Sequence, residues 1–457
     1  MKVLFVYTSV NVRSAGVHGE VAMQLGISSI SALLKSRGHE CELLLVTRPD
    51  FADIVDTRVA QFQPDVVAYT SVATQFPHIA AIAAQVSSKH PEIYQICGGP
   101  YATLAPQAAL EQAGLDAVCV GEGEYPMLEL IEALSRGQRP ARIANLCFRG
   151  PGGQIETNAP RPFTQDLDAL PLFDRELYAP YVDLGRYEHC IITTRGCPFN
   201  CSYCCNHAFK KLAAGRYVRS RSVGNVMAEV EQLRTSYPDM KYLHVEDEAV
   251  GLNRSMWDEL LGELKRTGLS FGVNYRIGVT GPEFLDRLRD ANFVRINVGI
   301  ESGNEWIRAN VLNRKYTNEQ ILATFSRARS LGMETKAYNL IGLPHETPER
   351  FEDTLRINQA ARPDHPRLYI FYPYPGTALD TMCDELGLKR GNEGEAIRER
   401  DESILNLPGF SREQIMEYCN SWRRRTRPSG PARLWHRLRR SLAGLSVGRD
   451  ASDATRH

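Results

Sequence analysis

The chain has 457 residues, 43% of them hydrophobic, and equal numbers of basic and acidic residues, 54 each. This length predicts two or three domains, because a single hydrophobic core stops growing beyond about 250–300 residues. The balanced charge argues against a protein whose whole surface binds nucleic acid. No apolar run reaches the roughly 18 residues that a transmembrane helix needs.

The first apolar run, residues 2–8, is too short for a signal peptide and predicts a first strand. The eleven cysteines follow no paired spacing of the kind that indicates a disulfide framework. Both features favour a reducing, cytoplasmic location.

In residues 1–140, five apolar runs alternate with amphipathic stretches. This alternation predicts a doubly wound, flavodoxin-like parallel sheet with helices on both faces. The expected strands are 2–8, 41–46, 65–71, 93–99 and 117–121, and the expected helices lie near 20–37, 51–62, 76–89, 106–113 and 124–136.

Glycines and hydroxyl residues follow four of these strands. Ligands of such sheets bind at the carboxyl ends of the strands, and glycine lets the backbone approach a large flat ligand. The alternative is that they are ordinary turn residues, but four such strings on one edge favour a binding site. The candidates are Ser9, Thr70, Ser71, Gly98, Gly99, Pro100, Tyr101, Gly121, Glu122, Gly123 and Glu124.

Residues 141–186 are rich in Pro, Gly, Arg and Asp, but apolar residues recur among them. This composition predicts an ordered connector containing one hairpin, rather than a flexible tether.

Residues 187–385 alternate again and predict six strand–helix units. Six units make a partial (β/α)6 barrel of the TIM type, whose chemistry belongs at the carboxyl-terminal mouth of the strands. Helix caps are expected at Thr280 and Thr317, each followed by Glu or Gln three residues later. The expected strands are 189–194, 241–246, 271–276, 293–300, 335–341 and 367–372.

Cys197, Cys201 and Cys204 directly follow the first of these strands, in a C-x3-C-x2-C pattern. Three thiolates do not complete a tetrahedral zinc site, but they suit a [4Fe–4S] cluster that keeps one iron open. The alternative is a zinc knuckle with a neighbouring Cys or His as the fourth ligand. A second C-x2-C pair would support that alternative, and none occurs.

This pattern, with Tyr203 before the last cysteine, closely resembles the motif of the radical S-adenosylmethionine (SAM) enzymes. The resemblance implies that the open iron binds SAM, and that one electron from a donor such as flavodoxin or ferredoxin releases a 5′-deoxyadenosyl radical. Matching strings at later strand ends imply further SAM-side residues. These are Glu246 and Asp247, then Glu301 and Ser302 in G-I-E-S-G, and Gly342 in G-L-P-H-E-T, where His345 replaces a glycine of the family pattern.

The strings at 98–103 and 120–124, placed before such a cluster motif, resemble the cobalamin-binding domain of B12-dependent radical SAM enzymes. The resemblance implies bound cobalamin and, as the main hypothesis, methylation of an unactivated carbon. Cyclisation or rearrangement without methyl transfer is the alternative, and a degenerate domain acting as a sensor or carrier is a third. Arg13 stands where related domains carry a cobalt-binding histidine, and His18 is off register, so cobalt without a protein histidine is expected.

Residues 386–457 are expected to form a short helical region that ends in a basic tail. Residues 423–440 contain eight arginines and no acid, and Leu434, Trp435 and Leu438 share one helical face. Such a tail is either a peripheral membrane anchor, which would favour a lipid-like substrate over another small molecule, or a solvated terminus. No residue is assigned to substrate contact or catalysis.

Overall fold

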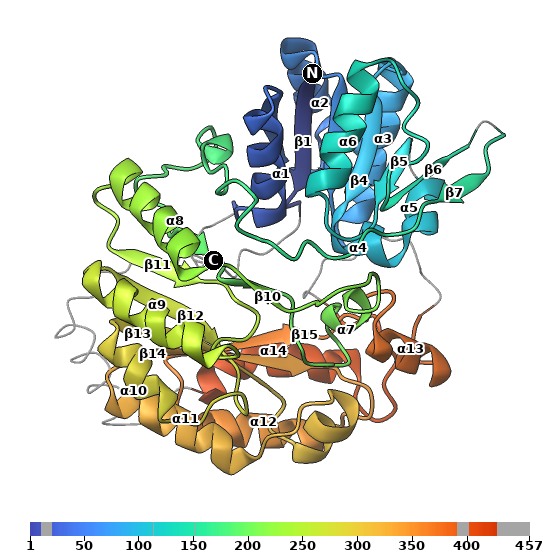
Figure 1. Ribbon diagram of the computed structural model, residues 1–457. Coiled ribbons are helices and arrows are strands. Elements are labelled where there is room, and N and C mark those ends of the chain that lie inside the picture. The colour runs from blue at the N-terminus through green and yellow to red at the C-terminus, as the bar shows by residue number, and fades with distance from the viewer. Residues whose placement is uncertain (11–20, 113, 151, 391–401, 427–457) are drawn as a thin grey trace.

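The computed structural model describes residues 1–10, 21–112, 114–150, 152–390 and 402–426 (Figure 1). Arg13, His18 and the basic tail from residue 427 onward lie outside these ranges, so the expectations about them stay predictions. No helix in the described part of the chain is long and apolar enough to cross a membrane.

The N-terminal unit is built on a seven-stranded sheet with the order β2-β1-β3-β4-β5-β6-β7. The first five strands run parallel, in the flavodoxin-like order that the sequence predicts. They are β1 (Lys2–Thr8), β2 (Glu40–Val46), β3 (Val66–Thr70), β4 (Tyr94–Gly98) and β5 (Ala117–Cys119). The helices are α1 (Leu25–Ser36), α2 (Ala52–Phe62), α3 (Phe76–Lys89), α4 (Gly99–Leu104), α5 (Pro106–Gln112) and α6 (Glu124–Ser135).

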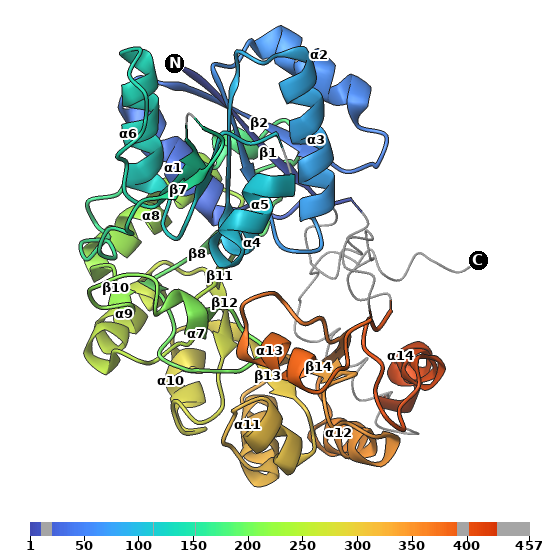
Figure 2. The same cartoon turned by 90° about the vertical axis from the view of Figure 1, so that its right-hand side faces the viewer.

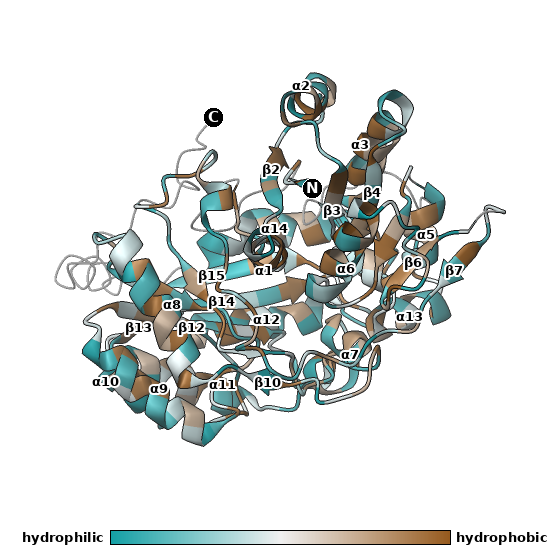
Figure 3. Ribbon diagram, turned by 45° about the horizontal axis from the view of Figure 1, so that its top comes forward, coloured by the Kyte–Doolittle hydropathy of each residue, from teal (hydrophilic) through white to brown (hydrophobic). Residues whose placement is uncertain are grey.

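Both faces of this sheet are covered, which explains why its strands are continuous apolar runs. Val3 and Phe5 of β1 belong to the core beneath α1 and α6, whereas Leu4 and Val6 belong to the core beneath α2 and α3. Figure 3 shows the result as largely hydrophobic colouring on β3.

The predicted hairpin of the connector consists of β6 (Leu146–Arg149) and β7 (Ile155–Thr157). It pairs antiparallel with β5 and so extends the N-terminal sheet past residue 140. The rest of the connector, with the short helix η1 (Glu176–Tyr178), is tied to the N-terminal unit. Tyr178 and Tyr187 accept hydrogen bonds from the backbone N–H groups of Gln24 (2.9 Å) and Met23 (3.0 Å).

The second unit is a six-stranded parallel sheet in the order β15-β14-β13-β12-β11-β8, which confirms the predicted partial barrel. It lies below the first unit in Figure 1. The strands are β8 (Cys190–Ile191), β11 (Tyr242–Val245), β12 (Ser270–Tyr275), β13 (Phe293–Glu301), β14 (Glu334–Ile341) and β15 (His365–Ile370). A short ribbon adds β9 (Thr194–Arg195) and β10 (Arg219–Ser220).

Helices on one face of this sheet bury its apolar side chains. The expected capping box at Thr317 and Gln320 is present. The cap expected at Thr280 is absent, because α10 begins only at Phe284 and the Thr280 hydroxyl donates to Tyr275 instead. The helices are α7 (Asn206–Phe209), α8 (Val223–Ser236), α9 (Arg254–Arg266), α10 (Phe284–Asp290), the π-helix η2 (Ile307–Val311), α11 (Asn318–Ser330), α12 (Pro348–Ala361) and α13 (Ala378–Glu385).

The C-terminal region is helical, as expected, and α14 (Arg412–Thr426) packs beside α12 (Figure 2). Trp422 donates a hydrogen bond to the Pro366 carbonyl at 3.1 Å, and Arg425 pairs with Glu352 at 2.6 Å. The beginning of the predicted basic tail is therefore part of the packed structure.

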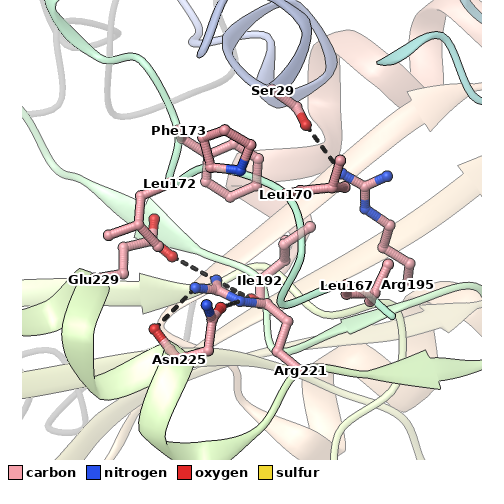
Figure 4. A pocket seen from close by; sticks show the side chains of 11 residues that line it. Ser29, Leu167, Leu170, Leu172, Phe173, Ile192, Arg195, Arg221, Asn225 and Glu229 are labelled. Atoms are coloured by element: carbon pink, nitrogen blue, oxygen red, sulfur yellow. Dashed lines mark hydrogen bonds and ion pairs between the residues drawn. The ribbon is translucent and has the colours of Figure 1, made fainter. Parts of the chain in front are cut away.

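A buried charge cluster joins the connector to the barrel. Glu229 of α8 is fully buried, and its two carboxylate oxygens each lie 2.5 Å from an arginine, Arg175 of the connector and Arg221 after β10. Arg175 also donates to the Cys190 carbonyl at 2.7 Å. Figure 4 shows Arg221 between Glu229 and Asn225. One carboxylate thus compensates two buried cations.

We expect Glu229→Gln to lower Tm by about 5–10 °C, because loss of one partner from a buried ion pair costs about 3–5 kcal/mol. Thermal unfolding followed by circular dichroism measures the effect. The control is Glu231→Gln on the same helix, whose exposed ion pair with Arg234 contributes at most about 1 kcal/mol. Equal Tm values for the two variants would contradict the role given to Glu229.

Candidate active site

The three cysteines lie on a loop that leaves the carboxyl end of the first barrel strand. Gly196 begins this loop with φ +85°, and a Cβ there would lie 2.3 Å from the Tyr217 carbonyl oxygen, so only glycine fits. Cys197 and Cys201 are buried, and Cys204 is half-buried. The loop is therefore packed into the barrel mouth.

Two of the sulfurs have hydrogen-bond donors beside them. Arg276, at the end of β12, donates a hydrogen bond to Cys201 Sγ at 3.2 Å and lies over the Phe199 ring at 3.9 Å. A hydrogen bond from Cys205 lowers the pKa of Cys204 to about 7. Burial instead raises the pKa of Cys197 to about 11, so this thiol needs a bound cation to ionise at neutral pH.

Among the described residues, no three His, Cys, Asp or Glu side chains form a group that could hold one metal ion. In a [4Fe–4S] cluster each thiolate binds a separate iron, and a loop with three cysteines at the barrel mouth suits that arrangement. The cysteine donors, with Arg276 beside one of them, fit the cluster.

Glu301, at the end of β13, holds the cluster loop from the opposite side of the mouth. Its carboxylate accepts hydrogen bonds from Tyr203 (3.0 Å) and Arg314 (2.6 Å). The aromatic residue before the last cysteine thus anchors the loop to Glu301. The residue itself has φ +61°, a strained conformation that is uncommon outside glycine and is often found at functional sites.

Two expected SAM-side residues, Asp247 and Ser302, are fully buried and bound to protein groups. Asp247 is fully buried and accepts hydrogen bonds from the backbone N–H groups of Thr193 (2.6 Å) and Thr194 (3.2 Å), which ties β11 to β8. Ser302 is also fully buried and faces Thr354 of α12. Asp247 thus holds two backbone N–H groups and Ser302 lies against α12, and their expected contact with SAM stays a prediction.

The neighbouring acids of the same string lie in the mouth. Glu246 accepts a hydrogen bond from Asn274 at 2.8 Å, and its side chain is 47% exposed. Glu248 accepts a hydrogen bond at 3.0 Å from Asn206, whose amide also lies 3.5 Å from Cys204 Sγ. Glu248 is thus closer to the cysteine loop than Asp247, although the sequence motif gave it no separate role.

Gly342 belongs to a tight turn held by a buried acid. Its N–H donates to Glu346 Oε2 at 2.7 Å, and the Leu343 N–H does so at 3.3 Å. Burial raises the pKa of Glu346 to about 8 despite these two bonds. His345, which replaces a family glycine, takes the left-handed conformation that glycine would favour, with φ +61°.

A cavity of about 340 Å³ opens at the carboxyl edge of the N-terminal sheet. Gly99 has φ +89°, and a Cβ there would lie 2.5 Å from Thr70 Oγ1, so glycine is required. Eight of the predicted residues line this cavity, namely Thr70, Gly98, Gly99, Pro100, Gly121, Glu122, Gly123 and Glu124.

The other three candidates of this edge lie outside the cavity lining. Ser9 has a buried hydroxyl, Ser71 lies against Cys97, and Tyr101 stacks on Phe76 with 4.4 Å between ring centroids. The cavity, with the glycines along its edge, has room for one part of a cofactor as large as cobalamin.

Residues of the connector and of the barrel close this cavity, and the sequence did not indicate them. Phe173 of the connector and Ile192 and Arg195 of the barrel complete the lining. Arg195 pairs with Glu124 at 2.7 Å and with Glu122 at 3.7 Å, and it donates to Ser29 at 3.2 Å (Figure 4). It also stands two residues before Cys197, so one side chain links the cavity to the cysteine loop.

The charge of Arg195 is matched by a buried acid. Burial alone would raise the pKa of Glu124, but the Arg195 guanidinium holds it below its usual value. Glu122 is shared with a second arginine, Arg219, at 2.8 Å. Arg195 thereby keeps the buried Glu124 ionised at neutral pH.

We expect anaerobically reconstituted protein to bind about four irons, and Cys201→Ala or Cys204→Ala to abolish SAM cleavage, because each would remove an iron ligand. Cys205→Ala is the matched control and should retain most of the cleavage. Iron content and 5′-deoxyadenosine formation check the prediction. Full cleavage by Cys201→Ala, or stoichiometric zinc in the active protein, would contradict it.

We expect the Tm of the Glu346→Gln variant to rise relative to that of the unmodified chain as pH rises. The folded chain binds the Glu346 proton with a pKa of about 8, above the usual 4.5, whereas the unfolded chain releases it near pH 4.5. The unmodified chain therefore loses stability between about pH 4.5 and 8. The amide does not titrate, so its Tm advantage should grow over this interval, at about 1.4 kcal/mol per unit of pKa shift at most. A Tm difference that stays constant from pH 5 to 8.5 would contradict a protonated Glu346.

Comparison with known proteins agrees with this layout. The family described as the Radical SAM superfamily matches residues 191–357, and the family described as the B12 binding domain matches residues 15–131. PH0819 of Pyrococcus horikoshii, an uncharacterized methyltransferase, is 26% identical over 83% of this chain and 82% of its own length. The anaerobic magnesium-protoporphyrin IX monomethyl ester cyclase of Rubrivivax gelatinosus is 25% identical over 85% of this chain and 70% of its own length.

The fold is shared with a solved enzyme. The radical SAM methyltransferase TsrM from Kitasatospora setae, solved with cobalamin and a [4Fe–4S] cluster bound, matches with a TM-score of 0.66. It is 21% identical, and the match covers 86% of this chain and 79% of that one. The chain carries a B12 binding domain followed by a radical SAM domain, and it belongs to the cobalamin-binding radical SAM enzymes.

Proposed function

We propose that the chain methylates an unactivated carbon of a small molecule, using cobalamin, SAM and a [4Fe–4S] cluster. The observation that carries the proposal is the cavity between the two units. The glycine strings of the B12 domain form one wall of this cavity, and Ile192 and Arg195 of the barrel form the other. A cofactor on the sheet edge therefore faces the start of the cysteine loop.

Different residues of the barrel mouth would hold the cluster and fix the loop beside it. Cys197, Cys201 and Cys204 would hold the cluster, with Arg276 stabilising one thiolate through its 3.2 Å hydrogen bond. Glu301, fixed by Tyr203 and Arg314, presents its carboxylate beside the loop. When bound, the cluster and SAM supply a 5′-deoxyadenosyl radical, and methylcobalamin supplies the methyl group.

Glu346 and Arg195 would act as positioning residues. Glu346 holds the turn at Gly342. The resemblance of this turn to the family motif implies that Gly342 contacts SAM. Arg195, between Glu122 and Glu124, holds the G-E-G-E string at a fixed place relative to the cysteine loop. Fixed placement of this kind contributes to catalysis by keeping the reacting groups in position.

Two further parts of the proposal concern the surroundings of the enzyme. The cluster needs a one-electron donor, for which a flavodoxin- or ferredoxin-type protein is the candidate, and an oxygen-sensitive cluster favours a cytoplasmic location. Membrane contact through the basic tail depends on residues 427–457, outside the described ranges, and stays a prediction.

Cyclisation without methyl transfer is the second candidate. The similarity to the cyclase of Rubrivivax gelatinosus favours it, since its identity is within one percentage point of that of PH0819. Methylation is preferred because both PH0819 and TsrM are described as methyltransferases.

The two candidates differ in their products. Anaerobic, reconstituted enzyme is incubated with SAM and candidate substrates, and S-adenosylhomocysteine is counted against 5′-deoxyadenosine. Methyl transfer to an unactivated carbon should yield both in about equal amounts once turnover is coupled, because one SAM supplies the radical and a second restores the methyl group. Product formation with 5′-deoxyadenosine alone would contradict methylation and favour the cyclase.

A further inference from the structure

The stretch of chain around the cysteine loop contains no acidic residue. It runs from residue 189 to residue 228, between Glu188 and Glu229. The arginines and lysines within it are Arg195, Lys210, Lys211, Arg216, Arg219 and Arg221. Basic and acidic residues are equal in number over the whole chain, 54 each, so positive charge is concentrated next to the cysteines.

Four of these cations are bound within the molecule. Three form the ion pairs Arg195–Glu124, Arg219–Glu122 and Arg221–Glu229. The fourth, Arg216, donates to Gln165 of the connector at 3.4 Å. The other two, Lys210 and Lys211, directly follow α7, and neither pairs with a carboxylate in the part of the chain that the structure describes. Their positive charge is therefore not offset by an ion pair.

A third lysine comes to the same loop from the other half of the barrel. Lys210 donates to the Pro198 carbonyl at 3.2 Å and to the Asn200 side chain at 2.5 Å. The Asn200 carbonyl accepts a hydrogen bond at 2.8 Å from Asn313. Lys315, two residues after Asn313, is exposed, and no carboxylate among the described residues pairs with it. Lysines thus lie on both sides of Asn200.

The cysteine loop reaches the surface between these lysines. Pro198 and Asn200 are exposed, although Cys197 and Cys201 beside them are buried. Figure 2 shows α7, which leads to the first two lysines, on the face turned to the viewer, with α13 beside it. A protein seated on this face would be separated from the buried cysteines by single residues of the loop.

The acids of the neighbouring helix leave this charge in place. α13 begins beside α7, where the Ala378 N–H donates to His207 Nε2 at 3.0 Å. Two of its acids share the cation of Lys389, namely Asp380 and Asp384. Its third acid, Glu385, lies at the opposite end of the helix from Ala378. The lysines beside the cysteine loop therefore form a basic surface.

We propose that this basic surface docks an acidic one-electron carrier protein. The surface, here called the lysine rim, consists of Pro198, Asn200, Lys210, Lys211 and Lys315. The inference rests on the proposed function and deepens it, because it says where the electron enters: the carrier is oxidised by one electron and the cluster is reduced by it. Complementary charge speeds the encounter of two proteins. A small, polar docking surface suits the transient complexes of electron transfer.

The first experiment measures binding. Oxidised flavodoxin of net negative charge is titrated at low ionic strength into the reconstituted enzyme and into its Lys211→Glu/Lys315→Glu double variant. Lys210 stays unchanged because it bonds the cysteine loop. We expect Kd to rise about tenfold in the variant, and the difference to shrink as salt is added, since salt screens exposed charges.

The control for binding is the Lys241→Glu/Lys265→Glu double variant, which changes the net charge equally. Lys241 directly precedes β11 and Lys265 is in the last turn of α9, so both are exposed at the end of the barrel opposite to the mouth. We expect its Kd to stay near that of the unmodified enzyme. Equal Kd values in all three proteins, or an equal rise in both variants, would overturn the lysine rim as the docking surface.

The second experiment separates docking from chemistry. 5′-Deoxyadenosine formation from SAM is followed with reduced flavodoxin and, separately, with photoreduced 5-deazariboflavin, a small uncharged reductant. We expect Lys211→Glu/Lys315→Glu to be about tenfold slower with limiting flavodoxin and unchanged with deazariboflavin. Equal slowing with both reductants would overturn the docking role. Absence of 5′-deoxyadenosine from the unmodified enzyme with deazariboflavin would contradict the proposed function, whereas the Kd values judge the docking surface independently.

Discussion

The placement of the two units depends on the ion pairs of Arg195. This arginine leaves the first barrel strand, reaches Glu124 at 2.7 Å and Glu122 at 3.7 Å, and is followed two residues later by Cys197. Its partner Glu124 is fully buried, so separating the two would expose an uncompensated charge to a low-dielectric interior. Charge pairing therefore holds the glycine-lined edge of the cavity in place relative to the cysteine loop, and Arg219 adds to it through Glu122 at 2.8 Å.

Strain at the barrel mouth is held by hydrogen bonds to buried polar side chains. Glu301 and His345 both adopt positive φ, which is uncommon for residues with side chains. Arg314 and Tyr203 fix the first, and Glu346 binds the turn that contains the second. Such conformations cost on the order of 1–3 kcal/mol each and persist only where surrounding contacts determine them. The barrel mouth thus combines strained backbone with hydrogen bonds that hold it in place. A site that positions cofactors for reaction requires such a fixed geometry.

The sequence predicted both sheets, because continuous apolar runs and amphipathic helices alternate with clear periods. It also located eight residues of the cavity lining, since each follows a strand end. It was less informative on side-chain direction. Neighbouring residues of a strand point to opposite faces, so the string 246–248 did not reveal that Asp247 is buried while Glu246 and Glu248 face the mouth. Arg195 was missed for another reason: its partners lie more than 70 residues away, and no local pattern marks such a pair.

The central claim is that both cofactors face one space between the two units. The most direct test is electron paramagnetic resonance of reconstituted enzyme that contains cob(II)alamin and the reduced [4Fe–4S] cluster together. The account predicts a magnetic interaction that changes both spectra relative to samples with either centre alone. A spectrum equal to the sum of the two separate signals would contradict it.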